Sequence, residues 1–153
     1  MSTIVRSTTI QKPIVEVFDY ATTIANWGVM HPAMARYLVT PPDHPKRVGE
    51  SFVEHTPMKM DLVWTVKECT RPMRWMAEAP VGKKSAVGMF TFSYQLAEMD
   101  NGTRFEMSLS FTPRSFLGKL MDLLMFAGAD RKDVEMAIIH LKQVMETGKS
   151  MHH

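Results

Sequence analysis

The sequence predicts a two-layer α+β domain, in which a curved antiparallel sheet of six to seven strands wraps around a long C-terminal helix. Apolar and polar residues alternate through several segments between 48 and 113, as in strands with one buried face. A Pro-free stretch from 115 to 147 carries helical spacing instead. The helical segments before the sheet are short, so the long helix is expected to cover most of its apolar face.

The first third of the chain predicts one strand followed by two short helices. Residues 4–10 alternate in part and are expected to form the strand. Lys12-Pro13 is expected to start the first helix, because Pro suits the first helical turn, and apolar residues follow at helical spacing: Ile14, Val17, Phe18 and Ala21. Residues 26–34 predict a second short helix or an ordered loop, and residues 37–47, with three prolines, predict a loop.

Five strands are expected in the middle of the chain. They are predicted at 48–55, 60–70, 74–79, 86–98 and 105–111, with a turn at Pro80-Val81-Gly82. In the last two strands Phe, Tyr, Leu and Met alternate with small polar residues, so each strand has one apolar face. Asn101-Gly102 between them predicts a type I′ hairpin turn, which needs positive φ. Glu54, His55, Arg74 and Glu78 are expected to point to solvent.

The C-terminal helix is predicted to carry two apolar stripes with a bend between them. The first stripe is Leu117, Leu120, Met121, Leu124 and Met125, and the second is Val134, Ala137, Ile138, Leu141 and Met145. Gly128 lies between the stripes and favours a bend or a short break there. Gly148 is expected to cap the helix at its end.

Length and composition exclude several classes of protein. The 153 residues are expected to form one domain over 1–150, and His152 and His153 in the tail 151–153 resemble a purification-tag remnant. A formal net charge of +2, spread along the chain, gives little reason to expect nucleic acid as a partner. The first residues lack the pattern of a signal peptide, and no apolar run is long enough for a membrane span, so a cytoplasmic protein is expected.

No cofactor or metal is expected from the motifs. Cys69 is the only cysteine, which excludes an internal disulfide and a Cys-based zinc motif. The histidines at 31, 44, 55 and 140 show no H-x-x-x-H pairing, and no glycine-rich phosphate loop is present. A G-x-S-x-G nucleophile motif is also absent.

A succession of short segments resembles a known superfamily over nearly the whole chain. The segments are PIVEVFDY at 13–20, WGVMHP at 27–32, VGESF at 48–52, NGTR at 101–104 and LKQVMETG at 141–148. Together they resemble the START-like, Bet v 1-like (SRPBCC) superfamily, and within it the bacterial polyketide cyclase/dehydrase-like group of lipid-transport proteins. The resemblance implies a helix-grip fold that binds a hydrophobic small molecule or lipid in a cavity between the sheet and the C-terminal helix.

The side chains expected to line that cavity come from the apolar strand faces and the helix. They are Trp27, Met34, Trp64, Phe90, Phe92, Tyr94, Phe105, Met107, Leu120, Met121, Leu124 and Ile138. For Trp64, and more so for Trp75, ordinary core packing is an alternative. The fifteen methionines of the chain suit either an adaptable cavity or a Met-rich core.

Three functions remain open from the sequence. The favoured one is a carrier or sensor of an apolar ligand, because a carrier needs no polar cluster and the polar candidates are scattered. The second is a cyclase or dehydratase that uses His31 or Tyr94 as its acid-base group. For His31 a hydrogen bond within its own loop is the preferred alternative, and for Tyr94 a hydroxyl that reaches solvent at the sheet edge. The third is a non-catalytic interaction protein with a filled core.

The stretch FLGKLMDLLMF at 116–126 is apolar on more than one helical face. A helix that is buried on one side does not need this surplus. It predicts a homodimer interface or a peripheral membrane contact.

Overall fold

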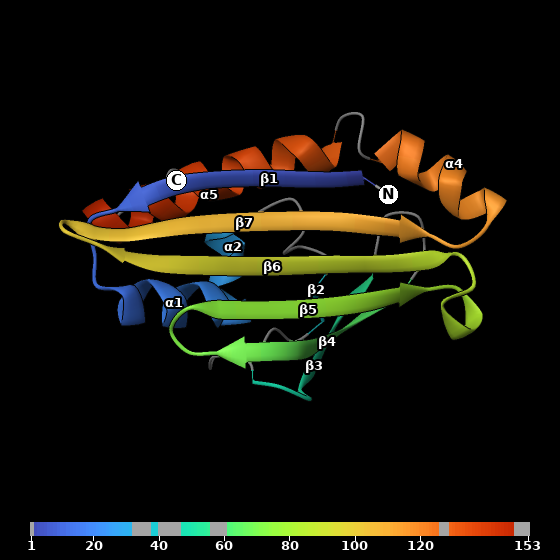
Figure 1. Ribbon diagram of the computed structural model, residues 1–153, viewed down its shortest axis with the longest axis horizontal. Helices are drawn as coiled ribbons and strands as arrows, with labels where there is room; N and C mark the ends of the chain where they lie inside the picture. Colours follow the sequence, from blue (N-terminus) through green and yellow to red (C-terminus); the bar gives the residue numbers. More distant parts are fainter. Residues whose placement is uncertain (1, 32–37, 40–46, 56–60, 126–128, 149–153) are drawn as a thin grey trace.

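The computed structural model describes residues 2–31, 38–39, 47–55, 61–125 and 129–148, and these form one antiparallel sheet with helices against it (Figure 1). The seven strands lie in the order β1-β7-β6-β5-β4-β3-β2. They are β1 (Ser2–Ile10), β2 (Leu38–Val39), β3 (Ser51–His55), β4 (Asp61–Thr70), β5 (Arg74–Val81), β6 (Gly88–Met99) and β7 (Gly102–Pro113). The predicted α+β architecture is confirmed.

The helices are short except at the C-terminal end. They are α1 (Ile14–Thr22), the 3-10 turn η1 (Ile24–Asn26), α2 (Trp27–Met30), the 3-10 turn η2 (Lys83–Ser85), α4 (Phe116–Met125) and α5 (Ala129–Thr147). Figure 1 shows α1, α2 and α5 behind the same face of the sheet, whereas α4 lies at one end of it. Among the described helices, none is both long and apolar enough to cross a bilayer.

The alternation predicted for the central strands is confirmed. In β6 the residues Phe90, Phe92, Tyr94 and Leu96 are buried, and the intervening side chains are more exposed. β6 pairs with β7 so that Tyr94 lies opposite Met107, and β1 then closes the far side of β7. Because side chains directly opposite in such a pair touch, the buried faces of both strands form one continuous apolar surface.

The turn between β6 and β7 differs from the predicted type I′ turn. Asp100 and Asn101 form the loop, and neither has the positive φ that type I′ requires. Gly102 has φ of +146° instead. A Cβ at Gly102 would lie 2.2 Å from the carbonyl oxygen of Ile10, so this glycine also permits the close approach of β1.

Several predicted boundaries were wrong in the same way, because local patterns do not register strand pairing. β3 begins at Ser51 and not at 48, where the chain still forms a turn with positive φ at Gly49. β5 continues through Pro80 and Val81, which pair with β6 where a turn was expected. The two-residue strand β2 lies inside the predicted loop 37–47, of which 37 and 40–46 lie outside the described residues.

The C-terminal stretch forms two helices, α4 and α5, and residues 126–128 between them, where the break was predicted at Gly128, lie outside the described residues. The backbone N–H of Gly118 donates to Ser115 Oγ, so Ser115 caps the first turn of α4. Gly148 has φ of +71° and its N–H donates to Val144 O, as expected of a glycine that ends a helix.

The two predicted apolar stripes differ in their burial. The α5 stripe is buried against the sheet at Val134, Ala137, Ile138 and Leu141. In α4 the buried positions are Gly118 and Met121, and the backbone of Gly118 lies against that of Val87, at the start of β6. Because α4 packs through its glycine side, Leu117 and Leu120 of the predicted stripe point outward and are exposed.

Candidate functional site

Aromatic side chains gather in the middle of the covered sheet face. Trp27 of α2 contacts Phe92 edge to face with ring centroids 5.5 Å apart, and Trp75 stacks on Tyr94 at 5.3 Å. Trp27 also donates its indole N–H to the Ala21 carbonyl, which fixes the ring at the end of α1. These rings pack in the offset and edge-to-face arrangements that aromatic pairs prefer, so the face is well ordered.

A histidine and a carboxylate meet within this aromatic face. His31 follows α2, its side chain is fully buried, and its ring lies 5.5 Å from that of Phe92. Its Nδ1 lies 3.1 Å from Oδ2 of Asp133 on α5. An ionised carboxylate only accepts hydrogen bonds, so Nδ1 donates, and in a ring that carries this single proton Nε2 is an acceptor. Asp133 is partly exposed, with the side chain 24% accessible.

The location of His31 differs from the loop contact that was the preferred alternative. Its side chain is fully buried. Its side chain also does not bond within its own loop, since it reaches α5 instead. A helix-to-helix contact between residues 102 positions apart has no local sequence signal.

Tyr94 lies beside His31 across a single aromatic ring. Phe92 is 5.1 Å from Tyr94 and 5.5 Å from His31, measured between ring centroids. Burial, with a smaller contribution from the Asp133 carboxylate, raises the pKa of the Tyr94 hydroxyl well above its ordinary value. Tyr94 is therefore a neutral hydrogen-bond donor at physiological pH. It is fully buried, so the expected alternative of a solvent-exposed hydroxyl was wrong.

Two polar atoms of this group have no hydrogen-bond partner among the described residues. They are Nε2 of His31 and Oη of Tyr94, and both are buried. A buried donor or acceptor left unsatisfied costs about 1–3 kcal/mol. Such groups are uncommon in folded proteins and call for a physical reason. In the singly protonated ring His31 Nε2 is an acceptor, and the Tyr94 hydroxyl can donate. Both side chains contact Phe92.

Asp133 was missed by the sequence analysis although a signal for it exists. It precedes Val134 in α5, and at helical spacing it shares a face with Ala137 and His140, both buried. An acidic residue on the buried face of an amphipathic helix is a candidate functional group. Three polar residues, Asp130, Arg131 and Lys132, directly precede it and hide this signal.

Glu54 also lies elsewhere than the sequence predicted. It shares the inner side of β3 with Phe52 and is buried, where a solvated side chain was expected. Its Oε1 accepts the indole N–H of Trp64 at 3.2 Å. The strict alternation of β3 already places residue 54 on the side of Phe52, which was the available signal.

The remaining predicted cavity residues lie mostly in the core. Of that set, Trp27, Trp64, Phe90, Phe92, Tyr94, Phe105, Met107, Met121 and Ile138 are buried. Leu120 is 46% exposed on the outer side of α4, so it does not face the interior as expected. Met34 and the Leu124 side chain lie outside the described residues.

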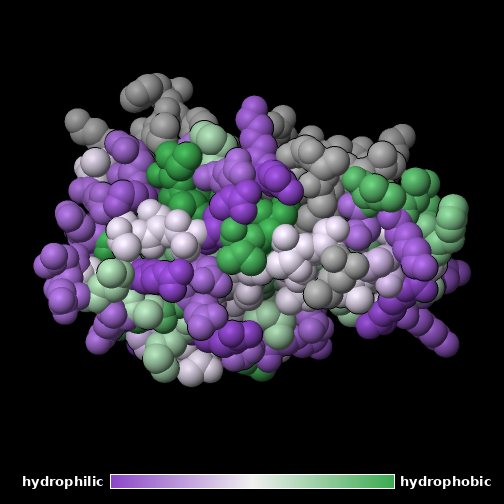
Figure 2. All heavy atoms as spheres, turned by 45° about the horizontal axis from the view of Figure 1, so that its top comes forward, coloured by the Kyte–Doolittle hydropathy of each residue, from purple (hydrophilic) through white to green (hydrophobic). Residues whose placement is uncertain are grey.

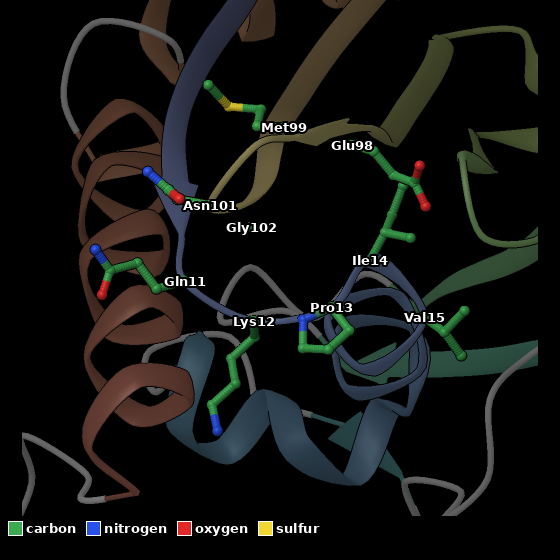
Figure 3. Close-up of a pocket in the computed structure, with 9 residues that line it drawn as sticks. All are labelled: Gln11, Lys12, Pro13, Ile14, Val15, Glu98, Met99, Asn101 and Gly102. Atoms are coloured by element: carbon green, nitrogen blue, oxygen red, sulfur yellow. The ribbon is translucent and has the colours of Figure 1, made fainter.

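A surface pocket of about 490 Å³ lies elsewhere, at the far end of the sheet from α4. The end of β1, the start of α1 and the β6–β7 turn enclose it (Figure 3). Its lining includes Lys12, Pro13 and Glu98 and none of the residues predicted to line a cavity. Within the described ranges, no group of three His, Cys, Asp or Glu side chains is placed to hold a metal ion.

Comparisons with known proteins agree on one family and one fold. The profile of the family described as polyketide cyclase / dehydrase and lipid transport matches residues 1–146. No curated protein matches the chain.

Among solved structures, the Aha1 dimer from Colwellia psychrerythraea is similar with a TM-score of 0.69 and 13% identity, covering 98% of this chain and 100% of that one. Protein BH1534 from Bacillus halodurans has a TM-score of 0.65 and 17% identity, covering 95% of this chain and 98% of that one. DynU16, from the dynemicin biosynthetic locus, has a TM-score of 0.66 and 14% identity, covering 98% of this chain and 49% of that one. At these identities the likeness shows the fold alone.

Proposed function

Because the chain belongs to the polyketide cyclase/dehydrase and lipid transport family, we propose that it binds an apolar small molecule on the aromatic sheet face beneath α5. The molecule is largely hydrocarbon or aromatic and carries at least one oxygen. The observation that carries this proposal is a pair of buried polar atoms, His31 Nε2 and Tyr94 Oη, for which the described part of the chain offers no hydrogen-bond partner.

The two atoms define what a ligand has to present. An acceptor at His31 Nε2 suits a ligand hydroxyl, and the neutral donor at Tyr94 Oη suits a carbonyl or ether oxygen. The surrounding Trp27, Trp75 and Phe92 supply apolar and ring-face contacts. A ligand that satisfies both atoms would recover the cost of burying them, which a purely hydrocarbon ligand would not.

Two ligands of nearly equal shape test this directly. β-Naphthol and naphthalene differ by one hydroxyl, and binding is measured by isothermal titration calorimetry. We expect the wild type to bind β-naphthol about 5- to 150-fold more tightly, since leaving a buried polar group unsatisfied costs about 1–3 kcal/mol. The preference should fall in Tyr94→Phe or His31→Phe, and persist in Tyr20→Phe, which removes a phenol hydroxyl from α1 instead.

Equal binding of both compounds, or an unchanged preference in both site variants, would exclude this ligand chemistry. Native mass spectrometry of the protein purified from cells, followed by extraction, then identifies what co-purifies. A defined lipid or polyketide-like compound supports carriage.

A second candidate function is proton-transfer catalysis in the same place, and the His31–Asp133 contact favours it. A carboxylate that holds Nδ1–H leaves Nε2 free to take a proton, which is how a histidine base is oriented. His31 would remove a proton from the carbon next to a carbonyl, and Tyr94 would donate a hydrogen bond to the carbonyl oxygen as it gains charge. The resulting enolate is the starting point for both cyclisation and dehydration.

Hydrogen–deuterium exchange separates the two candidates. β-Tetralone is an apolar ketone with acidic protons, and its exchange in deuterated water is followed by NMR. An enzyme of this kind accelerates exchange over buffer, and His31→Phe abolishes the acceleration. A carrier binds the ketone without changing its exchange rate.

A further inference from the structure

The outer face of α4 is an apolar surface with no protein against it among the described residues. Phe116, Leu117, Leu120 and Leu123 are 84%, 55%, 46% and 74% exposed. At about 100° per residue, these four positions span an arc of about 120° on one side of the helix. Gly118 lies on the opposite side of the helix and Met121 lies at the edge of this arc, and both are buried. Figure 2 shows apolar side chains gathered at the end of the molecule that carries α4, with hydrophilic side chains next to them.

Basic side chains border this apolar face. Lys119 is exposed on the flank of α4, and Arg114 is exposed just before the helix. Lys83 and Lys84 are exposed on η2, which lies at the same end of the molecule (Figure 1). The two segments are joined there, because Arg114 N–H donates to Val87 O at 2.9 Å and Gly118 packs against the same carbonyl.

The charge of this end is one-sided. Within 82–88 and 114–123 there are four cations, Lys83, Lys84, Arg114 and Lys119, and one acid, Asp122. Among the described residues these four cations form no ion pair. An exposed apolar helix face with a basic border matches the surface of an anionic membrane, where the apolar side chains enter the boundary of the hydrocarbon layer and the cations meet lipid headgroups.

We propose that α4 docks this protein onto anionic membranes, with Phe116, Leu117, Leu120 and Leu123 inserted and the four cations against the headgroups. A second copy of the chain fits the surface less well, because each copy would bring four cations and only one acid to the interface, so the charges are not complementary. The docking is peripheral, and it is independent of whether the buried site binds a ligand.

Vesicle co-sedimentation tests the proposal. The probe is a vesicle of phosphatidylcholine and phosphatidylserine at a molar ratio of about 7:3, compared with phosphatidylcholine alone. The wild type is expected to bind the mixed vesicles and to lose binding in high salt. Phe116→Ser/Leu123→Ser is expected to weaken binding at least about tenfold, since each substitution removes a large apolar side chain from the layer.

Matched variants separate the surface from general effects. Met73→Ser/Met99→Ser removes two exposed apolar side chains at the opposite end of the sheet and should bind as the wild type does. Lys119→Gln should weaken binding to the anionic vesicles, and Lys67→Gln on β4 should not. Thermal unfolding of each variant checks that the fold is retained.

Wild-type protein that stays in solution with the anionic vesicles would overturn the proposal, as would equal binding of the α4 and control variants. Analytical ultracentrifugation without lipid tests the competing explanation, in which this face forms a dimer. A dimer that dissociates in Phe116→Ser/Leu123→Ser would assign this face to a second copy. If the wild type binds the anionic vesicles but not β-naphthol, the ligand proposal for the buried site fails and the membrane proposal stands.

Discussion

The Nδ1 atom of His31 lies 3.1 Å from the Oδ2 atom of Asp133 and joins the end of α2 to α5. The contact fixes the ring so that Nε2 faces buried surroundings, where the described residues offer it no partner. Asp133 keeps some contact with solvent, which lowers the cost of holding a carboxylate there. The pair is therefore an orienting contact, and in the proposed function Nε2 is the atom that meets the ligand.

Asp133→Asn tests this orienting role. Asn retains the shape and can still accept from Nδ1, so the fold should persist, with a loss of about 1 kcal/mol for exchanging a charged hydrogen bond for a neutral one. The preference for β-naphthol over naphthalene should fall, because Asn can also donate and no longer fixes the His31 tautomer. Calorimetry and thermal unfolding measure both effects.

The control for that variant is Glu135→Gln, two residues further along α5. Glu135 is exposed and bonded to Arg6 on β1, so its replacement removes a negative charge from the same helix without touching His31. A ligand preference that falls equally in both variants would show a general charge effect and count against orientation by Asp133.

Tyr94→Phe is expected to be tolerated or slightly stabilising at neutral pH. The hydroxyl that it removes is buried without a partner among the described residues, and deleting such a group relieves its desolvation cost. A change between zero and about +1 kcal/mol in the free energy of unfolding is expected. Denaturant unfolding measures it. A loss of several kcal/mol would mean that the hydroxyl has an essential structural bond.

The same variant should flatten the loss of stability in alkali. Burial raises the pKa of Tyr94 in the folded protein, so above about pH 10 the unfolded chain releases this proton while the folded chain keeps it. Stability therefore falls as pH rises through that range, and Phe removes this contribution. Burial also raises the pKa of Tyr20, so some alkaline loss should remain until Tyr20→Phe is added.

Most of the fold, but only part of the candidate site, could be predicted from the sequence. Alternation in β6 identified Phe90, Phe92 and Tyr94 as one face, because strand periodicity is a property of the local chain. His31 and Tyr94 were named singly, but their meeting with Asp133 depends on how α2 and α5 cross the sheet. Packing between distant elements leaves no local pattern, so the polar group could not be assembled in advance.

The outer face of α4 is a second feature that the sequence predicted only in part. The apolar surplus of 116–126 was visible in the sequence, but the face that α4 would bury was not. Leu120 was expected inside because its spacing matches a helical stripe. The close packing of Gly118 on Val87 turns that stripe outward, and this is a property of backbone contact rather than of apolar pattern.

Glu146→Gln is expected to weaken the attachment of α5 to β1. Its Oε2 accepts the backbone N–H of Gln11 at 2.9 Å and the Lys142 ammonium at 3.0 Å, and these contacts, the first above all, lower the pKa of Glu146. The carboxylate stabilises the fold above its unfolded pKa of about 4.3, and this is lost as pH falls through the lower folded value.

The stability difference between Glu146→Gln and wild type should therefore be largest near neutral pH and shrink in acid. Thermal unfolding over a pH series measures it. A difference that stays constant with pH would show that the amide disturbs packing and that the charge has no role. Lys142→Gln in the same background completes a double-mutant cycle for the pair.

Gly118→Ala and Gly28→Ala form a matched pair that separates helix propensity from backbone packing. Alanine in a helix is ordinarily favoured over glycine by about 1 kcal/mol. At Gly28 in α2 an added Cβ meets nothing within 4 Å, so this variant should be neutral or slightly more stable. At Gly118 the Cβ would lie 2.0 Å from the carbonyl oxygen of Val87, so α4 has to move.

We expect Gly118→Ala to lower the free energy of unfolding by about 1–3 kcal/mol, the usual cost of overpacking. This loss occurs although alanine has the higher helix propensity. The opposite signs of the two variants are the diagnostic result, measured by denaturant unfolding of both proteins. Hydrogen exchange of the α4 amides should accelerate in Gly118→Ala while those of β6 and β7 away from the contact stay protected. If Gly118→Ala were as stable as Gly28→Ala, α4 would not be anchored through this glycine, and the outward direction of Leu120 and Leu123 would need another cause.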